Sequence, residues 1–188
     1  NEDDRRLLET LRLSVLRGAD MTKQILTFTR GHHGDRGLVN LKHLVSEIAK
    51  IAIETFPRLI RIETDAAKDL WLVLADATQM HQVLMNLCVN ARDAMPDGGR
   101  LAVALQNVTL GEGHRSLQTG AKPGRYLRLT VTDTGVGIAP ENLDRIWDPF
   151  FSLKPENEGT GLGLSTVAGI VRSHGGFTHV ESRLGEGS

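Results

Sequence analysis

A glycine-rich segment followed at once by a helical pattern constrains this chain more than any other feature. In residues 158–165, three glycines alternate with Thr and Leu to give EGTGLGLS. Glycine permits backbone conformations that are closed to other residues, so main-chain N–H groups can approach a ligand closely. A helix N-terminus adds unpaired N–H donors and a positive dipole end, which favour a phosphate group. The segment predicts a phosphate-binding turn, although similar turns also precede helices that bind nothing, and it is neither a P-loop nor a Rossmann fingerprint.

The composition is that of an ordinary globular domain. The chain has 188 residues, 40% of them hydrophobic, and a formal net charge of -1, so no basic surface indicates nucleic-acid binding. No apolar run is long enough to cross a membrane, and we expect no membrane contact by this segment. The one cysteine, Cys88, excludes an internal disulfide and reads as a buried apolar residue. Because the chain opens at Asn1 without a Met, we expect it to be part of a larger protein.

Residues 1–30 have the pattern of one long helix. Its a/d seam, typical of a coiled coil or bundle, follows alternating four- and three-residue steps through Leu8, Leu11, Val15, Gly18, Thr22, Ile25 and Thr29. A seam this wide needs a partner, which could be an upstream helix, a second copy of the chain or the downstream domain. Residues 31–37 are rich in glycine and predict a linker. We interpret His32 and His33 within it as solvated, because no cysteine or acidic cluster completes a metal site.

Helices and strands are expected to alternate after the linker. Asn40 can cap a helix running to about Phe56, and alternating apolar residues predict strands at 60–64 and 70–74. Asp76 can cap a second helix, whose apolar face comprises Met80, Leu84, Leu87, Cys88 and Ala91. The opposite arc carries amides and one carboxylate: Gln79, Gln82, Asn86, Asn90 and Asp93. Polar arcs are usually solvated, but Asn is unfavourable inside a helix, so two of them four residues apart suggest a function.

Two more strands are expected at 101–105 and 127–131, with a variable loop at about 110–124 between them. The second of these strands ends in Asp133, followed by glycines in the sequence DTGVGI. A carboxylate there could accept a hydrogen bond from a buried ligand, although a simple β-turn also explains the glycines. The irregular stretch 147–154 combines three aromatic residues with Lys154, which fits a packed loop or a lid over a ligand.

Four boxes in this order resemble those of sensor histidine kinases: NLCVNARDA at 86–94, DTGVGI at 133–138, WDPFF at 147–151 and EGTGLGLS at 158–165. The resemblance covers about residues 38–188 and extends to the superfamily of gyrase, heat-shock chaperone and mismatch-repair ATPases. It implies an α/β fold, an α+β two-layer sandwich in which a mixed sheet packs on helices. ATP would lie between the helices, under a lid formed by residues 147–160.

The resemblance also implies ATP and Mg2+ as cofactors. Asn90 would ligate Mg2+ with support from Asn86, and Asp133 would accept from the adenine amino group. Arg92 or Lys154 would offset phosphate charge, and Asn86, Asn90 and Lys154 form the expected catalytic set. Phe150 and Phe151 would anchor the lid. The expected ATP-binding residues are Asn86, Asn90, Arg92, Asp93, Asp133, Gly135, Gly137, Ile138, Phe151, Lys154, Gly159, Thr160, Gly161, Leu162, Gly163 and Leu164.

Residues 1–33 resemble the second helix of a dimerisation and phosphotransfer hairpin, but the first helix, with its phosphoacceptor histidine, has no match here. We therefore expect the cytoplasmic, ATP-binding catalytic region of a membrane-bound or soluble sensor histidine kinase. It would transfer the ATP γ-phosphate to a histidine outside this chain, for relay to the aspartate of a response regulator receiver domain. With a complete hairpin it would form a homodimer. The alternatives are an ATP-hydrolysing machine and a nucleotide-binding scaffold. Hydrolases of the superfamily have a glutamate where Asn86 stands, and an amide cannot act as a general base.

Overall fold

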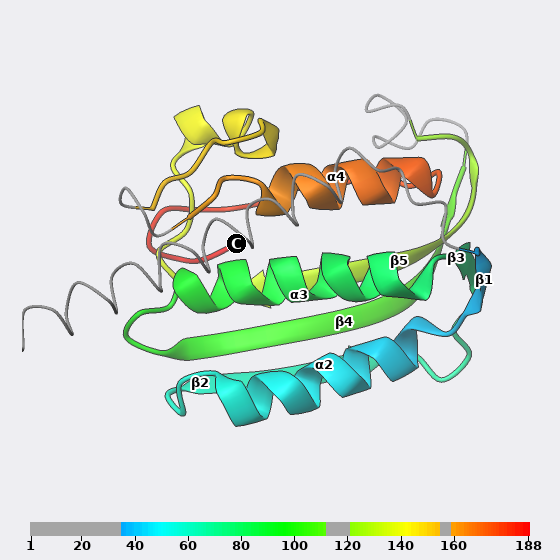
Figure 1. Ribbon diagram of the computed structural model, residues 1–188, viewed down its shortest axis with the longest axis horizontal. Helices are drawn as coiled ribbons and strands as arrows, with labels where there is room; N and C mark the ends of the chain where they lie inside the picture. Colours follow the sequence, from blue (N-terminus) through cyan, green and yellow to red (C-terminus); the bar gives the residue numbers. More distant parts are fainter. Residues whose placement is uncertain (1–34, 112–120, 155–158) are drawn as a thin grey trace, which may run out of the picture.

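The computed structural model describes residues 35–111, 121–154 and 159–188. Figure 1 shows helices lying side by side over a sheet, in two layers, and this sheet has one parallel and one antiparallel pair of strands, which confirms the predicted α/β sandwich with a mixed sheet. The long helix predicted for residues 1–30 lies outside the described residues. The elements are β1 Gly37–Val39, α2 Leu41–Thr55, β2 Ile60–Ala66, β3 Val73–Ala75, α3 Ala77–Asp93, β4 Gly99–Leu110, β5 Gly124–Asp133, the 3-10 turns η2 Pro140–Asn142 and η3 Arg145–Trp147, and α4 Gly163–Ser173.

Strand β4 is the centre of the three-stranded sheet. It pairs in parallel with β2, from Ile60↔Gly99 to Ala66↔Leu105, and antiparallel with β5. In the β4–β5 register Asp133, the last residue of β5, lies opposite Leu101. Because β4 begins soon after α3 ends, this register brings Asp133 close to the C-terminal end of α3. The sheet thus places the carboxylate that the sequence predicts to bind a ligand beside the helix that carries the asparagines.

A short antiparallel ribbon of β1 and β3 lies outside this sheet, with Leu38 opposite Leu74. Its first residue, Gly37, was expected in the linker. The strand predicted at 70–74 is instead confined to Val73–Ala75. The reason is a competing contact from β4, because the Asn107 side chain accepts from the Trp71 N–H at 2.9 Å and donates to the Asp69 carbonyl at 2.6 Å. These two hydrogen bonds fix residues 69–71 in and directly after a turn, so these residues do not pair as part of a strand.

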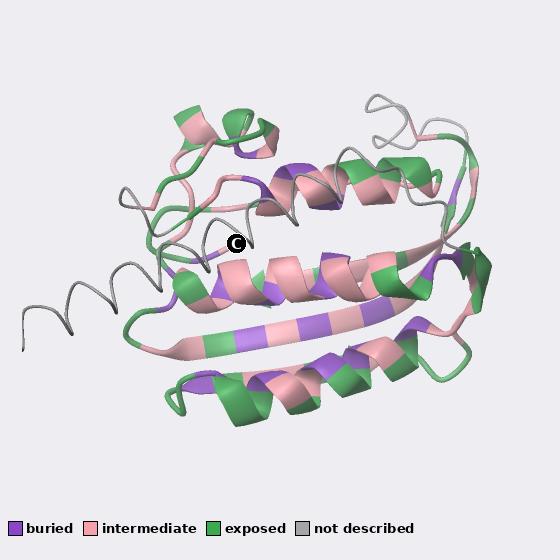
Figure 2. Cartoon of the chain, in the orientation of Figure 1, coloured by how far each residue is buried: buried purple, intermediate pink, exposed green. Residues whose placement is uncertain are grey.

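The core lies between the helices and the sheet. Figure 2 shows buried and half-buried residues alternating along β4, where Leu101, Val103 and Leu105 face the helices. The predicted faces of α2 and α3 are largely confirmed, although Leu44, Met80 and Leu87 are only half-buried. Burial raises the pKa of the Cys88 thiol to about 11, so this residue is a neutral core side chain. The buried helix residues are Leu41, Val45, Ile48, Ala52, Val83, Leu84, Cys88 and Ala91.

Both predicted helix caps are present. The Asn40 side chain accepts from the Lys42 N–H at 3.0 Å, and Asp76 Oδ1 accepts from the N–H groups of Thr78 and Gln79 at 2.8 and 3.2 Å. Such caps satisfy donors that a helix start leaves without a carbonyl partner. Within the described ranges, no helix combines the length and the apolar character that a membrane span requires.

Candidate functional site

The two asparagines of the polar arc of α3 lie against the start of α4. The Asn86 side-chain amide donates to the Gly163 carbonyl at 3.3 Å. A Cβ placed on Gly163 would lie 3.6 Å from Nδ2 and 3.9 Å from Oδ1 of Asn90. The two asparagines and the first turn of α4 therefore line one site. This contact explains why Asn86 and Asn90 are half-buried and not fully solvated.

The start of α4 is suited to an anion. Its N-cap position is Leu162, whose side chain cannot accept a hydrogen bond, and the first helical bond is donated by the Thr166 N–H to the Leu162 carbonyl. The backbone N–H groups that precede Thr166 in the helix have no carbonyl acceptor within the helix itself. Together with the helix dipole they favour negative charge beside Asn86 and Asn90.

The loop that precedes α4 is held by close backbone contacts. The Phe150 N–H donates to the Gly161 carbonyl at 3.0 Å, and Gly161 adopts a φ of +66°. A Cβ on Gly161 would overlap the backbone of Phe150, which itself has a φ of +68°, an uncommon value for a residue other than glycine. This stretch can therefore reach α4 only with glycine at 161.

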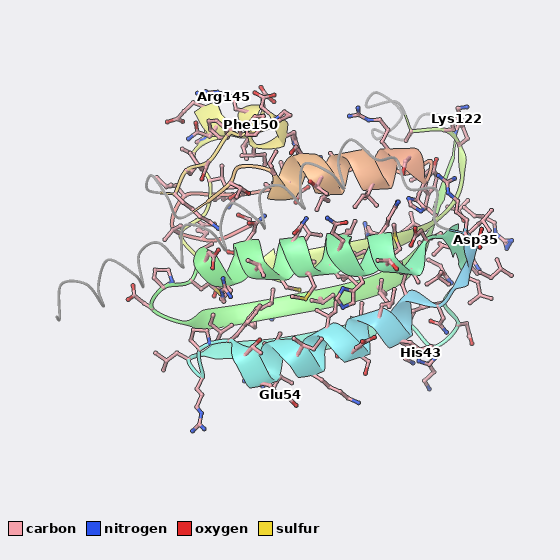
Figure 3. All side chains as sticks on the ribbon, in the orientation of Figure 1. Asp35, His43, Glu54, Lys122, Arg145 and Phe150 are labelled. Atoms are coloured by element: carbon pink, nitrogen blue, oxygen red, sulfur yellow. The ribbon has the colours of Figure 1, made fainter. Side chains whose placement is uncertain are left out.

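The two phenylalanines expected to anchor this loop differ in their contacts. Phe150 is 66% exposed, so the prediction that its ring anchors the loop is wrong, and the contact with Gly161 is made by its main chain. Figure 3 places both Phe150 and Arg145 in the segment above α4. The Arg145 guanidinium lies over the ring of the neighbouring Phe151, 4.4 Å from its centroid. Phe151 is therefore the aromatic residue that packs within the loop.

Asp133 lies at the other end of the site and is 8% exposed. Burial raises the pKa of its carboxyl group, and this effect exceeds the opposing one of hydrogen bonds from the Gly135 and Ser188 backbone. The Gly135 N–H donates to Asp133 Oδ1 at 2.8 Å. A carboxyl group whose pKa is raised by burial is a candidate for a functional site.

The segment after Asp133 packs against the C-terminal residues. Gly137 has a φ of +68°, and a Cβ there would overlap the Arg183 carbonyl. The Ile138 N–H donates to the Ser182 hydroxyl at 2.8 Å, and the Asp133 N–H donates to the Ser188 carbonyl at 2.9 Å. Sequence analysis missed Ser182 and Ser188, because no helical or strand periodicity marks residues 177–188.

An ionic cluster joins the loop to the end of α3. Arg92 Nη2 lies 2.6 Å from Asp93 Oδ1, and Lys154 Nζ contacts Asp93 Oδ2. Burial alone would raise the pKa of Asp93, but hydrogen bonds and charge from Lys154 and Arg92 outweigh it and lower that pKa below its usual value. Both predicted phosphate-side cations thus lie together, and Asp93 is their counter-ion.

Apart from this ionic cluster, the predicted site residues form two groups in space. Asn86, Asn90 and Gly163 meet at the start of α4, with Gly161 and Leu162 immediately before it. Asp133, Gly135, Gly137 and Ile138 form the second group beside the end of α3, where the Val136 N–H donates to the Ala94 carbonyl at 2.9 Å. Leu162 is buried, so only its main chain is available to a ligand.

Comparison with known proteins agrees with this geometry. Residues 75–188 match the family described as histidine kinase-, DNA gyrase B- and HSP90-like ATPase. The chain belongs to this family. Sensor kinase CckA of Brucella abortus is 35% identical over 92% of this chain and 18% of that protein, and sensor histidine kinase ZraS of Escherichia coli is 32% identical over 89% and 33%. This member of the family therefore spans a third or less of the length of these relatives.

Solved structures lead to the same group. The mycobacterial sensor histidine kinase MprB has a TM-score of 0.59 and 25% identity, covering 74% of this chain and 80% of that one. Full-length ShkA in complex with AMPPNP has a TM-score of 0.73 and 25% identity, covering 97% of this chain and 36% of that one. This family member is thus an ATP-binding catalytic domain of the sensor histidine kinase type.

Substituting two glycines of this domain tests the loop geometry. Gly161→Ala should destabilise the fold by about 1–2 kcal/mol from the positive φ alone, with further cost from overlap with Phe150, and should weaken ATP binding. Gly169→Ala is the matched control, because Gly169 lies within α4 with nothing near its Cβ position. This substitution should stabilise the fold by about 0.5–1 kcal/mol. Urea unfolding and ATP titration measure both variants. If both substitutions changed the free energy of unfolding and the ATP affinity equally, the proposed need for glycine at position 161 would be contradicted.

Proposed function

We propose that this domain binds MgATP between α3, α4 and residues 133–138 and phosphorylates a histidine on a dimerisation helix outside this chain. The observation that supports this most directly is the position of Asn86 and Asn90 against the amide groups at the start of α4. In the transfer step, a bond forms between the histidine nitrogen and the γ-phosphorus while the bond from that phosphorus to the β–γ bridging oxygen breaks, which leaves ADP. A response regulator aspartate then accepts the phosphoryl group.

The two groups of residues would recognise the two ends of the nucleotide. At the adenine end, the buried Asp133 carboxylate would accept from the amino group of the base, with Gly135, Gly137 and Ile138 around it. At the phosphate end, the main chain of residues 159–164 and the α4 dipole would hold the triphosphate. Lys154 and Arg92 both form ion pairs with Asp93. A bound phosphate would attract either cation and would compete with Asp93 for it. Phe151 would help to hold the covering loop.

The residues at the phosphate end fit a magnesium ion. The described residues contain no group of three His, Cys, Asp or Glu side chains that could hold a metal alone. Mg2+ is commonly bound by few protein oxygens together with substrate phosphates and water, so one amide oxygen from Asn90 suffices. The Asn86 amide nitrogen is engaged by Gly163, which would keep that side chain beside Asn90 as a support. When bound, Mg2+ would neutralise phosphate charge.

Transfer to a protein is favoured over hydrolysis. Asn86 cannot remove a proton from water, and phosphoryl transfer needs positioning and charge neutralisation more than covalent chemistry. Relatives named sensor kinases support this choice over a scaffold. A histidine kinase of the same fold, ThkA, forms a complex with response regulator protein TrrA, which supports a receiver domain as partner.

We further propose that residues 1–33 supply one dimerisation helix, that residues 38–188 form the catalytic domain, and that both work in the cytoplasm.

Asp133→Asn tests the adenine assignment. The asparagine can still accept from the Gly135 N–H but would present an NH2 group to the adenine amino group, so two donors would meet. We expect ATP affinity to fall roughly 10- to 100-fold, the value of a hydrogen bond to a charged group. Calorimetric titration measures this, with Asp97→Asn in the exposed turn after α3 as control. Unchanged affinity in the Asp133 variant would rule out this role.

Asn90→Ala tests the metal assignment. The wild-type chain should bind ATP more tightly with Mg2+ than with a chelator, and the variant should lose most of that difference, because an amide oxygen ligand is removed. Binding of free ATP should change little. Paired titrations with and without Mg2+ measure the affinity for MgATP and the affinity for free ATP in each protein. A variant that keeps the full magnesium effect would show that Asn90 is not a ligand.

Phosphotransfer itself separates the three functions. The isolated chain should bind ATP, hydrolyse it slowly and label none of its seven histidines. Given a separately produced dimeric hairpin with the acceptor helix, it should produce an acid-labile, base-stable phosphohistidine. Radiolabelled ATP and gel analysis follow this reaction. Fast multiple-turnover hydrolysis would indicate an ATPase instead, and ATP binding without transfer to any hairpin would indicate a scaffold.

A further inference from the structure

His174 has a partner for each of its ring nitrogens. It follows the last residue of α4 and is half-buried. The Asp76 backbone N–H donates to Nε2 at 3.1 Å, and Nδ1 lies 2.8 Å from the Ile170 carbonyl oxygen. A backbone N–H can only donate, so Nε2 must accept and the ring proton must be on Nδ1. That proton is then donated to Ile170, and the neutral imidazole satisfies both neighbours.

This imidazole joins opposite ends of two helices. Asp76 caps the start of α3, so the bond from its N–H ties the end of α4 to the start of α3. At the other end of the pair, Asn86 in α3 holds Gly163 at the start of α4. The two ties are ten positions apart along α3, at Asp76 and Asn86, or about 15 Å. Two ties this far apart fix both the spacing and the angle between the helices.

A neighbouring contact strengthens the same end. The Arg36 guanidinium donates to the Ser173 carbonyl at 2.9 Å, and the adjacent β1 pairs with β3, which leads directly into Asp76. The Arg36 contact is exposed and is therefore of small energetic value. The His174 bond is the one shielded polar link between the two helices at this end that the described residues contain.

We propose that His174 is a positioning residue for the phosphate end of the ATP site. By holding the end of α4 against the start of α3, it keeps the amide groups at the start of α4 aligned with Asn86 and Asn90. His174 itself touches no ligand in this arrangement and acts through the helix. The inference rests on the proposed ATP site and adds that phosphate affinity, more than adenine affinity, depends on this distant link.

Two neutral substitutions separate the roles of the ring nitrogens. In His174→Gln, the longer side chain can place an oxygen near the position of Nε2 and still accept from the Asp76 N–H. In His174→Asn, the shorter amide can donate to the Ile170 carbonyl but cannot reach Asp76. His179→Asn is the matched control, because the His179 side chain is 68% exposed and its recorded partner is Glu181 on the same segment.

We expect the affinity for the phosphate part of the nucleotide to change and the affinity for its adenosine part to stay the same. His174→Asn should lower MgATP affinity roughly 3- to 10-fold, the value of one lost hydrogen bond, while adenosine affinity stays within twofold. His174→Gln and His179→Asn should keep both affinities within twofold of wild type. A residue needed only for stability would lower the melting temperature without changing the ratio of the two affinities.

The outcomes distinguish this inference from the proposed function. If the wild-type chain binds no ATP, the proposed function fails and the inference fails with it. If the wild type binds ATP but the Asn and Gln variants behave alike, the inference alone is overturned. A 15N spectrum of wild-type His174 near neutral pH needs no variant, and should show protonated Nδ1 and unprotonated Nε2. The opposite tautomer would overturn the proposal even if His174→Asn failed to fold.

Discussion

The arrangement of this domain depends on helix α3 burying two different faces at once. Its apolar side, with Leu84, Cys88 and Ala91, packs into the core beneath it. This contact fixes the rotation of the helix about its axis, because turning it would expose apolar surface to water. The opposite side, with Asn86 and Asn90, must then face α4. The amides are placed by a hydrophobic constraint on residues that do not themselves contact the site.

The electrostatics around α4 are those of a site prepared for an anion. A negative ligand there would meet helix N–H groups, and Lys154 and Arg92 lie at the end of α3, where the single charge of Asp93 offsets one of their two positive charges. Asp133 has the opposite character, since burial raises its pKa and no cation compensates for its desolvation among its recorded partners. One carboxylate therefore organises charged side chains, and the other is available to a neutral donor. This difference matches a ligand that is anionic at one end and neutral at the other.

The groups proposed to act on the phosphate are amides, main-chain N–H groups and cations, which suits a reaction that depends on placement. Phosphoryl transfer gains most of its acceleration from alignment and charge neutralisation, so an error of a fraction of an ångström between α3 and α4 matters. The ties at both ends of this helix pair, through Asn86 and through His174, are consistent with that demand. The acceptor histidine belongs to a separate element in the proposed reaction, so the domain presents the phosphate to it.

The sequence by itself determined the elements whose signals are local. Apolar periodicity predicted α2, α3, β4 and β5, and the caps at Asn40 and Asp76 followed from their side chains, because both signals depend on residues within one or two turns. Only the tertiary structure decided that the Phe150 backbone and not its ring holds the loop, that Lys154 pairs with Asp93, and that β3 is confined to Val73–Ala75. The link from Asp76 to His174 spans 98 residues. Such contacts depend on how strands and helices are brought together, and a linear pattern encodes burial and backbone freedom but not which distant partner fills each position.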